Sequence, residues 1–230
     1  MNARIRSFFV LILLLSIAPL ACGAPIFQDG FESGTLGSQW SVSGTNNGRA
    51  TVSPDNGPAN GVRHLVLDDG VTDAIYSAAE ATLTLDLSNK KNVVLSFNAK
   101  SLGNEPDAPP AGNFTTTRNY DGVAISTDGG TTWRAVQTLA TVGTAWQNFS
   151  VTLDSSVTAL GGAFGPGFRI RFSEYDNASA PLDGIAIDDV IVTADDDQRT
   201  LLELPTPLVE GTGPYTGYVL LAFAPATPHG

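Results

Sequence analysis

Alternation of apolar and polar residues with a period of two constrains the fold of this chain most strongly. Residues 92–99, 147–153 and 168–172 each alternate in this way. A strand points successive side chains to opposite faces, so the pattern is typical of antiparallel strands with one buried face. Many such strands, separated by turn residues among the 24 glycines and 14 prolines, predict a β-sandwich. Weaker strand candidates are residues 26–32, 38–43, 62–67, 73–77, 81–87, 120–127 and 132–138.

The first residues are interpreted as an export signal and not as part of the fold. Arg4 and Arg6 precede the unbroken apolar run of residues 8–15, and small residues follow it. A basic start, a short apolar run and a small-residue exit are typical of a secretory signal peptide, here residues 1–24. The cleavage site stays open, because residues 20–23 resemble a bacterial lipobox in which Cys22 would carry a lipid anchor.

Cysteine content and net charge indicate where the protein is located and exclude some classes of binding partner. Cys22 is the only cysteine, so the predicted domain, residues 26–194, contains no disulfide. Exported animal domains usually carry disulfides, which favours a bacterial protein that is secreted or held at the cell surface. A net charge of −11 argues against nucleic acids and anionic membranes as partners, since both need a basic face. A lipid anchor at Cys22 would be the exception.

The remaining segments are predicted to be loops or linkers. Residues 44–61 and 101–119 are rich in glycine, asparagine and proline, and long loops of this kind either face a ligand or are mobile insertions. Residues 195–230 begin as an acidic linker and are too short to bury a core of their own. Within them, residues 209–213 and 218–224 resemble the opening of a Calx-beta domain. Either a truncated second domain begins there, or residues 218–224 add a strand to the sandwich.

Motifs near both ends of the domain carry a family resemblance. Residues 31–40 contain a Phe-Glu pair, then Gly34 and Trp40, and residues 187–190 read Ile-Asp-Asp-Val. In this order they resemble the jelly-roll modules that include MAM domains, bacterial cleaved-adhesin domains and calcium-containing carbohydrate-binding modules. MAM domains carry cysteines, so the bacterial branch is the better match. The resemblance implies an all-β, antiparallel jelly-roll β-sandwich with long loops over residues 26–194.

The same resemblance implies a structural calcium ion that joins the first and last strands. Calcium takes about six to eight oxygen ligands, many of them from carboxylates. Glu32 and Asp189 are the first candidates, followed by Asp29 and Asp188. Strict alternation through residues 185–192 would bury one aspartate of the pair among apolar side chains, which is costly. Either a bulge or a cation resolves this conflict, and two solvated acids on an edge strand are the alternative.

Residues 126–133 match the Asp-box pattern, S-x-D-x-G-x-x-W. We expect a hairpin in which Asp128 accepts hydrogen bonds from turn amides, Gly129 and Gly130 adopt positive φ, and Trp133 packs beneath. Sialidases carry several such boxes, one in each propeller blade. A single box indicates a folding element, and all three tryptophans are expected in the core.

Catalytic signatures do not occur in the sequence. Neither His64 nor His229 has a cysteine partner outside the export segment, and no HExxH or GxSxG motif is present. Residues 174–176 begin the ExDxxE signature of laminarinase-type glycosidases, but residue 179 is a serine, so the acid–base pair fails. We therefore expect a protein that is not an enzyme.

Candidates for ligand binding are residues of the kinds that contact sugars, namely aromatic rings and polar side chains beside them. They are Tyr120, Tyr175, Tyr76, Asn119 and Arg118. These residues and the resemblance predict an extracellular binding or adhesion module with a glycan ligand. The alternatives are a surface spacer that contacts another protein and an accessory domain of a larger secreted hydrolase.

Overall fold

The computed structural model describes residues 25–103, 105–116 and 118–197. The predicted signal peptide with Cys22 and the predicted Calx-beta-like tail lie outside these residues. No helix among the described residues is long and apolar enough to cross a membrane.

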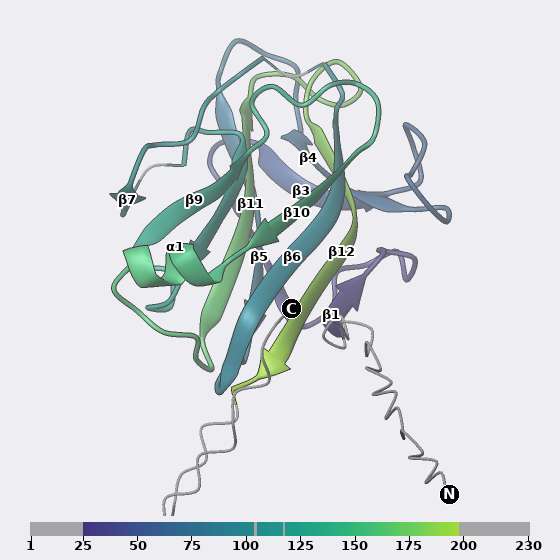
Figure 1. Cartoon of the computed structure of the whole chain (residues 1–230). Helices are drawn as coiled ribbons and strands as arrows, with labels where there is room; N and C mark the ends of the chain where they lie inside the picture. The colour runs from purple at the N-terminus through teal and green to yellow at the C-terminus, as the bar shows by residue number, and fades with distance from the viewer. Residues whose placement is uncertain (1–24, 104, 117, 198–230) are drawn as a thin grey trace, which may run out of the picture. The chain divides into compact units, whose positions relative to one another are not determined.

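The described residues form two six-stranded sheets and one short helix (Figure 1). The order in the first sheet is β10 (Gln147–Thr152), β6 (Lys90–Ser101), β12 (Ile185–Asp196), β4 (His64–Asp69) and β3 (Gly48–Ser53), and β1 (Pro25–Asp29) pairs with β12. The order in the second sheet is β2 (Trp40–Gly44), β5 (Ser77–Leu85), β11 (Phe168–Asp176), β8 (Gly122–Ser126), β9 (Trp133–Thr138) and β7 (Asn113–Phe114). Helix α1 (Asp154–Ala159) follows β10. Every strand pair is antiparallel, so the predicted all-β sandwich is confirmed.

One hydrophobic core fills the space between the two sheets. Phe97 of β6 and Phe172 of β11 meet there edge to face, with ring centroids 5.3 Å apart. Both side chains are fully buried, and burying a phenylalanine contributes about 1.5–3 kcal/mol. Because alternate residues of each strand point into this core, the polar residues between them face outward.

Three predicted elements differ from the structure. Residues 73–76 form a bend before β5, where the Asp73 carboxylate accepts a hydrogen bond from the Ile75 amide at 2.6 Å, so the strand expected over 73–77 is wrong. The expected loop 44–61 contains β3, in which only Ala50 and Val52 face the core, so its alternation with polar residues is too short to stand out from the surrounding loop sequence. The loop 101–119 contains the two-residue strand β7.

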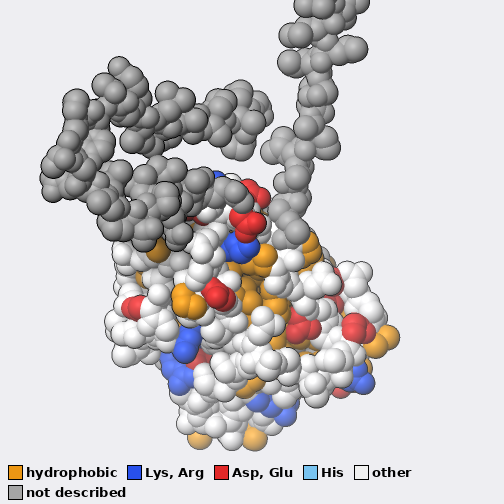
Figure 2. Space-filling view, turned by 90° about the horizontal axis from the view of Figure 1, so that it is seen from below, with side chains coloured by type: hydrophobic (Ala, Val, Ile, Leu, Met, Phe, Trp, Pro, Cys, Tyr) orange, Lys and Arg blue, Asp and Glu red, His pale blue; other side chains and the backbone are white. Residues whose placement is uncertain are grey.

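The two ends of the sandwich differ in character. Seen from below, hydrophobic side chains gather in the middle of the described surface, with charged side chains scattered around them (Figure 2). The loops that follow β4, β6 and β11 lie at the opposite end, at the top of Figure 1. The register agrees, since Asp176 at the end of β11 stands opposite Ser77, and Ser101 at the end of β6 stands opposite Ile185.

Candidate functional site

The first and last strands of the domain lie side by side. β1 pairs antiparallel with β12, and Asp29 stands opposite Val190. Asp29, Glu32 and Asp189 line one open hollow of about 420 Å³. The structure therefore brings three of the four predicted calcium ligands to one place, which we call the terminal-strand hollow.

A β-bulge separates the fourth candidate, Asp188, from this hollow. The pairing of β12 with β6 shifts register between Asp188 and Ile191, and Asp189 has a φ of 50°. Asp188 is fully buried and accepts hydrogen bonds from the amides of Ala59 and Asn60, at 2.9 and 3.2 Å. Burial raises the pKa of the Asp188 carboxyl. Strict alternation would have buried one of the two adjacent aspartates among apolar side chains, and the sequence left a bulge or a cation as the solution. The structure contains the bulge.

Protein donors already contact the acids of the terminal-strand hollow. Asp29 accepts hydrogen bonds from the Phe31 amide at 2.8 Å and from the indole of Trp40 at 2.9 Å. Glu32 accepts them from the amides of residues 62 and 63, and Asp189 from Asn98 Nδ2 at 2.8 Å. A carboxylate offers about four lone-pair sites, so each acid retains capacity for a cation. The carboxylate oxygens of Asp29, Glu32 and Asp189 do not all lie within 4.8 Å of one another, so the calcium ion at this hollow stays a prediction.

A second group of acids, not predicted from the sequence, lies at the top end of the sandwich. One carboxylate oxygen each from Glu174, Asp176 and Asp183 lies within 4.8 Å of the others, and all three residues are buried. We call this set the buried acidic cluster. On β11 the inward-facing row that contains Ile170 and Phe172 continues as Glu174 and Asp176, because strand residues two apart share a face.

The buried acidic cluster has strongly shifted acidities. Burial raises the pKa of Asp176 to about 7 and that of Asp183 to about 8. Burial also raises the pKa of Glu174 well above its usual range, and the nearby charge of Asp176 adds to the shift. The charged neighbours that shift these three pKa values are all acids, so the cluster lacks a compensating base among the described residues.

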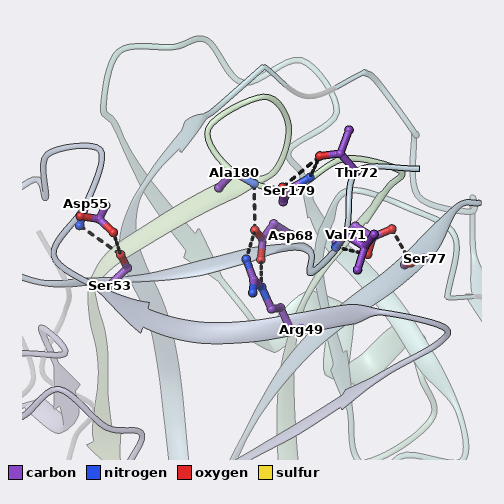
Figure 3. A network of polar contacts seen from close by, with 10 residues as sticks. Arg49, Ser53, Asp55, Asp68, Val71, Thr72, Ser77, Ser179 and Ala180 are labelled. Atoms are coloured by element: carbon purple, nitrogen blue, oxygen red, sulfur yellow. Dashed lines mark hydrogen bonds and ion pairs between the residues drawn. The ribbon is translucent and has the colours of Figure 1, made fainter. Parts of the chain in front are cut away.

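Polar contacts hold the loop that carries Asp183 against β3 and β4 (Figure 3). The guanidinium of Arg49 donates two hydrogen bonds to Asp68, both 2.9 Å long, and the amide of Ala180 donates a third of the same length. The hydroxyls of Thr72 and Ser179 are 3.0 Å apart. Because the loop is fixed at residues 179 and 180, the position of Asp183 is set by strands far away in the sequence.

Two of the predicted ligand-binding residues meet at the same end of the molecule. The rings of Tyr76 and Tyr175 are stacked, with centroids 5.2 Å apart and planes inclined by 29°. The stack is open to solvent at Tyr76, because 40% of the surface of that residue is exposed. Its hydroxyl donates a hydrogen bond to Glu105 at 2.7 Å, which raises the pKa of Tyr76 to about 12. The carboxyl of Glu105 in turn contacts that of Asp183.

The other predicted ligand-binding residues lie elsewhere. Tyr120 is fully buried and its hydroxyl accepts hydrogen bonds from Arg171, so the expected exposed ring is wrong. Arg118 forms an ion pair with Glu80 in a separate hollow on the outer face of the second sheet. Asn119 is exposed. The sequence gives no sign that the loop after β6 folds over this sheet and buries Tyr120.

The β8–β9 hairpin has the predicted turn geometry. Asp128 accepts hydrogen bonds from the amides of Thr131 and Thr132 at 3.1 and 2.8 Å, and Gly129 and Gly130 have φ of 72° and 94°. The indole of Trp133 donates to the Gly130 carbonyl at 2.8 Å. These contacts are structural, and they leave the residues of the hairpin with no evident chemical role.

Of the three tryptophans, only Trp40 packs in the core between the sheets, because Trp133 belongs to a separate buried cluster with Phe114 and Tyr120. Trp40 and Trp133 are buried, whereas Trp146 is half-buried, and its indole donates to the Gly57 carbonyl at 2.9 Å. Its ring packs edge to face with the fully buried His64, with centroids 5.6 Å apart. Trp146 thus covers a buried histidine and anchors the loop before β4.

Comparison with known proteins gives distant structural likenesses only. No protein-family model and no curated protein matches the chain. Similar solved structures include TmCBM61 in complex with beta-1,4-galactotriose, which is 18% identical with a TM-score of 0.43, over 72% of this chain and 94% of the other. The CBM22-1–CBM22-2 tandem domain from Paenibacillus barcinonensis Xyn10C is 16% identical with a TM-score of 0.46, over 76% and 47%. The K2 cleaved adhesin domain of Lys-gingipain is 15% identical with a TM-score of 0.45, over 73% and 97%. At these values the likenesses do not assign a ligand to this chain.

Proposed function

We propose that this domain is a non-catalytic binding module that recognises a glycan at the Tyr76–Tyr175 stack. The observation that carries the proposal is an aromatic pair at the end of the sandwich, open on its Tyr76 side, with the carboxylate of Glu105 beside it. An aromatic ring offers an apolar face on which a pyranose can stack, and a few polar groups at its edge fix orientation. Glu105 supplies an acceptor for sugar hydroxyls.

Hydrogen bonds join the two loops next to the ring stack of Tyr76 and Tyr175. The amide of Asp73 donates to the Asn177 carbonyl at 3.1 Å, and Thr72 and Ser179 join the same two loops. These loops flank Tyr76 and Tyr175 in sequence, so the stack is built on anchored segments. A rigid aromatic surface loses little conformational entropy when a ligand binds.

Replacing Tyr76 with alanine is expected to weaken glycan binding by at least about tenfold, because aromatic anchors at binding sites contribute roughly 2 kcal/mol. Tyr175→Ala should act in the same direction, since Tyr175 supports the ring of Tyr76. A glycan microarray followed by affinity electrophoresis on the polysaccharides that bind would measure the effect. Val42→Ala, on an exposed apolar residue of β2, is the control and should bind as the unaltered chain does.

Contact with another protein is the second candidate. Val71, Ile75 and Leu182, on loops at the same end, are 48, 56 and 67% exposed. Exposed apolar side chains that gather near an aromatic pair are also typical of protein-binding surfaces. If the unaltered chain binds no glycan on the array, the glycan proposal is refuted and this alternative takes its place.

We further propose an extracellular setting and a bacterial cleaved-adhesin-type or MAM-like relationship, and both proposals are supported by sequence motifs. The signal-peptide pattern of residues 1–24 supports export, with a lipid anchor at Cys22 as the alternative to a freely secreted form. The Phe-Glu and Asp-Asp motifs at the two ends of the domain support the relationship.

We also propose that a calcium ion in the terminal-strand hollow joins β1 to β12, with Glu32 and Asp189 as its carboxylate ligands. Glu32→Gln removes a ligand charge and should reduce the rise in melting temperature that calcium causes, because an ion that binds only the folded state stabilises it in proportion to its affinity. Differential scanning calorimetry with calcium and with chelator measures this rise. A Glu32→Gln chain with the full calcium response would contradict the proposal.

A further inference from the structure

The carboxylates of the buried acidic cluster have no cationic side chain paired with them among the described residues. Glu174 and Asp176 are fully buried, and none of their four carboxylate oxygens accepts a hydrogen bond of standard geometry. Asp183 is 3% exposed, accepts a hydrogen bond from the amide of Gly184 at 2.7 Å, and also contacts the carboxyl of Glu105, which is itself an acid. Buried charges in proteins are normally paired or coordinate a metal.

Neighbouring buried acids show that this lack of donors is specific to the cluster. Asp68 is paired with Arg49, and Asp69 accepts hydrogen bonds from the Val71 amide at 3.0 Å and the Ser77 hydroxyl at 2.9 Å. The fold therefore provides donors for the acids on β4. It provides no such donor for Glu174, and for Asp176 the backbone amide of Asp69 is the one donor among the described residues that acts on the carboxylate. One oxygen of each lies within 4.8 Å of the other and of Asp183.

We propose that Glu174, Asp176 and Asp183 bind a calcium ion, at a site separate from the terminal-strand hollow. Calcium–oxygen bonds of about 2.3–2.6 Å allow one ion to bridge oxygens as far apart as those of the cluster. Carboxylates are the hard ligands that this ion prefers, and magnesium usually keeps several water ligands, which suits a buried set less well. Glu105, whose carboxyl contacts that of Asp183, is placed to contribute a further oxygen.

The ion would fix three separate segments of the top end. Glu174 and Asp176 belong to β11, Asp183 to the loop before β12, and Glu105 to the loop after β6. Tyr175 lies between the two ligands on β11, and Tyr76 hydrogen-bonds to Glu105. Calcium binding is thus inferred from the cluster alone, and it does not depend on whether the tyrosine stack recognises a glycan.

Replacing one ligand with its neutral analogue tests the site, because the difference in melting temperature between the variant and the unaltered chain should change sign when calcium is added. In chelator, Glu174→Gln should melt at a higher temperature than the unaltered chain, because it removes like-charge repulsion among buried carboxylates. In calcium the order should reverse. In a Glu32→Gln background, which weakens the terminal-strand site, calcium at about 100 times its dissociation constant for the cluster should raise the melting temperature by roughly 5–10 °C, and adding Glu174→Gln should remove this rise. Asp86→Asn, at an exposed turn, is the matched control and should retain it.

Calorimetric titration of the full chain with calcium gives the affinity and the stoichiometry directly. Since loss of an outer-shell partner alone costs about 10–100-fold in metal affinity, loss of a direct ligand in Glu174→Gln or Asp176→Asn should cost at least about 100-fold at this site. Glu32→Gln should leave this binding event in place and affect only the terminal-strand hollow. Terbium gives a second measurement in the Glu32→Gln background, where binding beside Trp40 at the terminal-strand hollow is weakened. Emission sensitised by Tyr175, which lies between two ligands in sequence, should then be lost on adding Glu174→Gln.

Two results would overturn the proposal. One is an unchanged calcium isotherm in both Glu174→Gln and Asp176→Asn. The other is a Glu174→Gln chain that is more stable than the unaltered chain by the same margin with calcium and with chelator, which would show that protons alone neutralise the cluster. Neither result concerns glycans, so failure here is distinct from failure of the proposed function.

Discussion

Arg171→Met is expected to lower the free energy of unfolding by about 1.5–3 kcal/mol, the typical worth of a buried hydrogen bond to a charged group, because Glu80 then keeps only its second ion pair, with the partly exposed Arg118. Arg171 Nη1 is 3.0 Å from Glu80 Oε1, and the two side chains are 8% and 2% exposed. The same guanidinium donates to the Tyr120 hydroxyl at 2.9 Å and lies 4.2 Å from the ring centroid of Trp133. Urea unfolding followed by tryptophan fluorescence would measure the loss.

A matched variant separates the ion pair from the loss of a long side chain. Arg169 also lies on the outward face of β11 and forms no ion pair among the described residues. Arg169→Met should therefore cost less than about 1 kcal/mol, as surface substitutions usually do. A cost for Arg171→Met no larger than that for Arg169→Met would contradict this account.

His64→Phe is expected to remove a pH dependence worth up to about 3 kcal/mol between pH 7 and pH 4. Burial, together with the charge of Lys100 and against an opposing effect of Asp55, lowers the pKa of His64 to about 4. Below pH 6.5 the unfolded chain takes up a proton that the folded chain does not. Stability therefore falls as the pH falls through this range, and it is retained at neutral pH. Phenylalanine preserves the edge-to-face contact with Trp146.

The measurement compares the two chains at each pH in the presence of chelator. Carboxyls whose pKa is raised on folding, such as that of Asp183, act in the opposite direction, since they bind protons more tightly in the folded state. Their contribution is common to both chains and cancels in the difference. A difference in unfolding free energy that stays constant from pH 7 to pH 4 would show that His64 does not titrate differently on folding.

The sequence predicts the strands well where inward positions are apolar. Residues 92–99, 147–153 and 168–172 correspond to β6, β10 and β11, because their alternation reflects one buried and one exposed face. Alternation of apolar and polar residues predicts that β11 ends at residue 172, whereas the strand continues to Asp176. Its inward row continues through Glu174 and Asp176, and acidic residues at inward positions look like the end of a buried strand.

The sites were predictable only in part, because their geometry depends on pairing between distant segments. The motifs containing Glu32 and Asp189 correctly indicate that the first and last strands of the described domain meet. Tyr76 and Tyr175 were separate candidates, and the register that sets Asp176 opposite Ser77 brings their rings together. Asp183 joins the acidic cluster through a loop held by Asp68, and no local pattern signals that contact.

The place of β12 has a consequence for synthesis on the ribosome. This strand is made last among the described elements, yet it occupies the interior of the first sheet, between β6 and β4, and also pairs with β1. A nascent chain that stops before residue 185 leaves β1 without a partner and splits the rest of the first sheet into the separate pairs β10–β6 and β3–β4, so it cannot close its core. We therefore expect cooperative folding only after β12 emerges, with earlier intermediates that are sensitive to proteases.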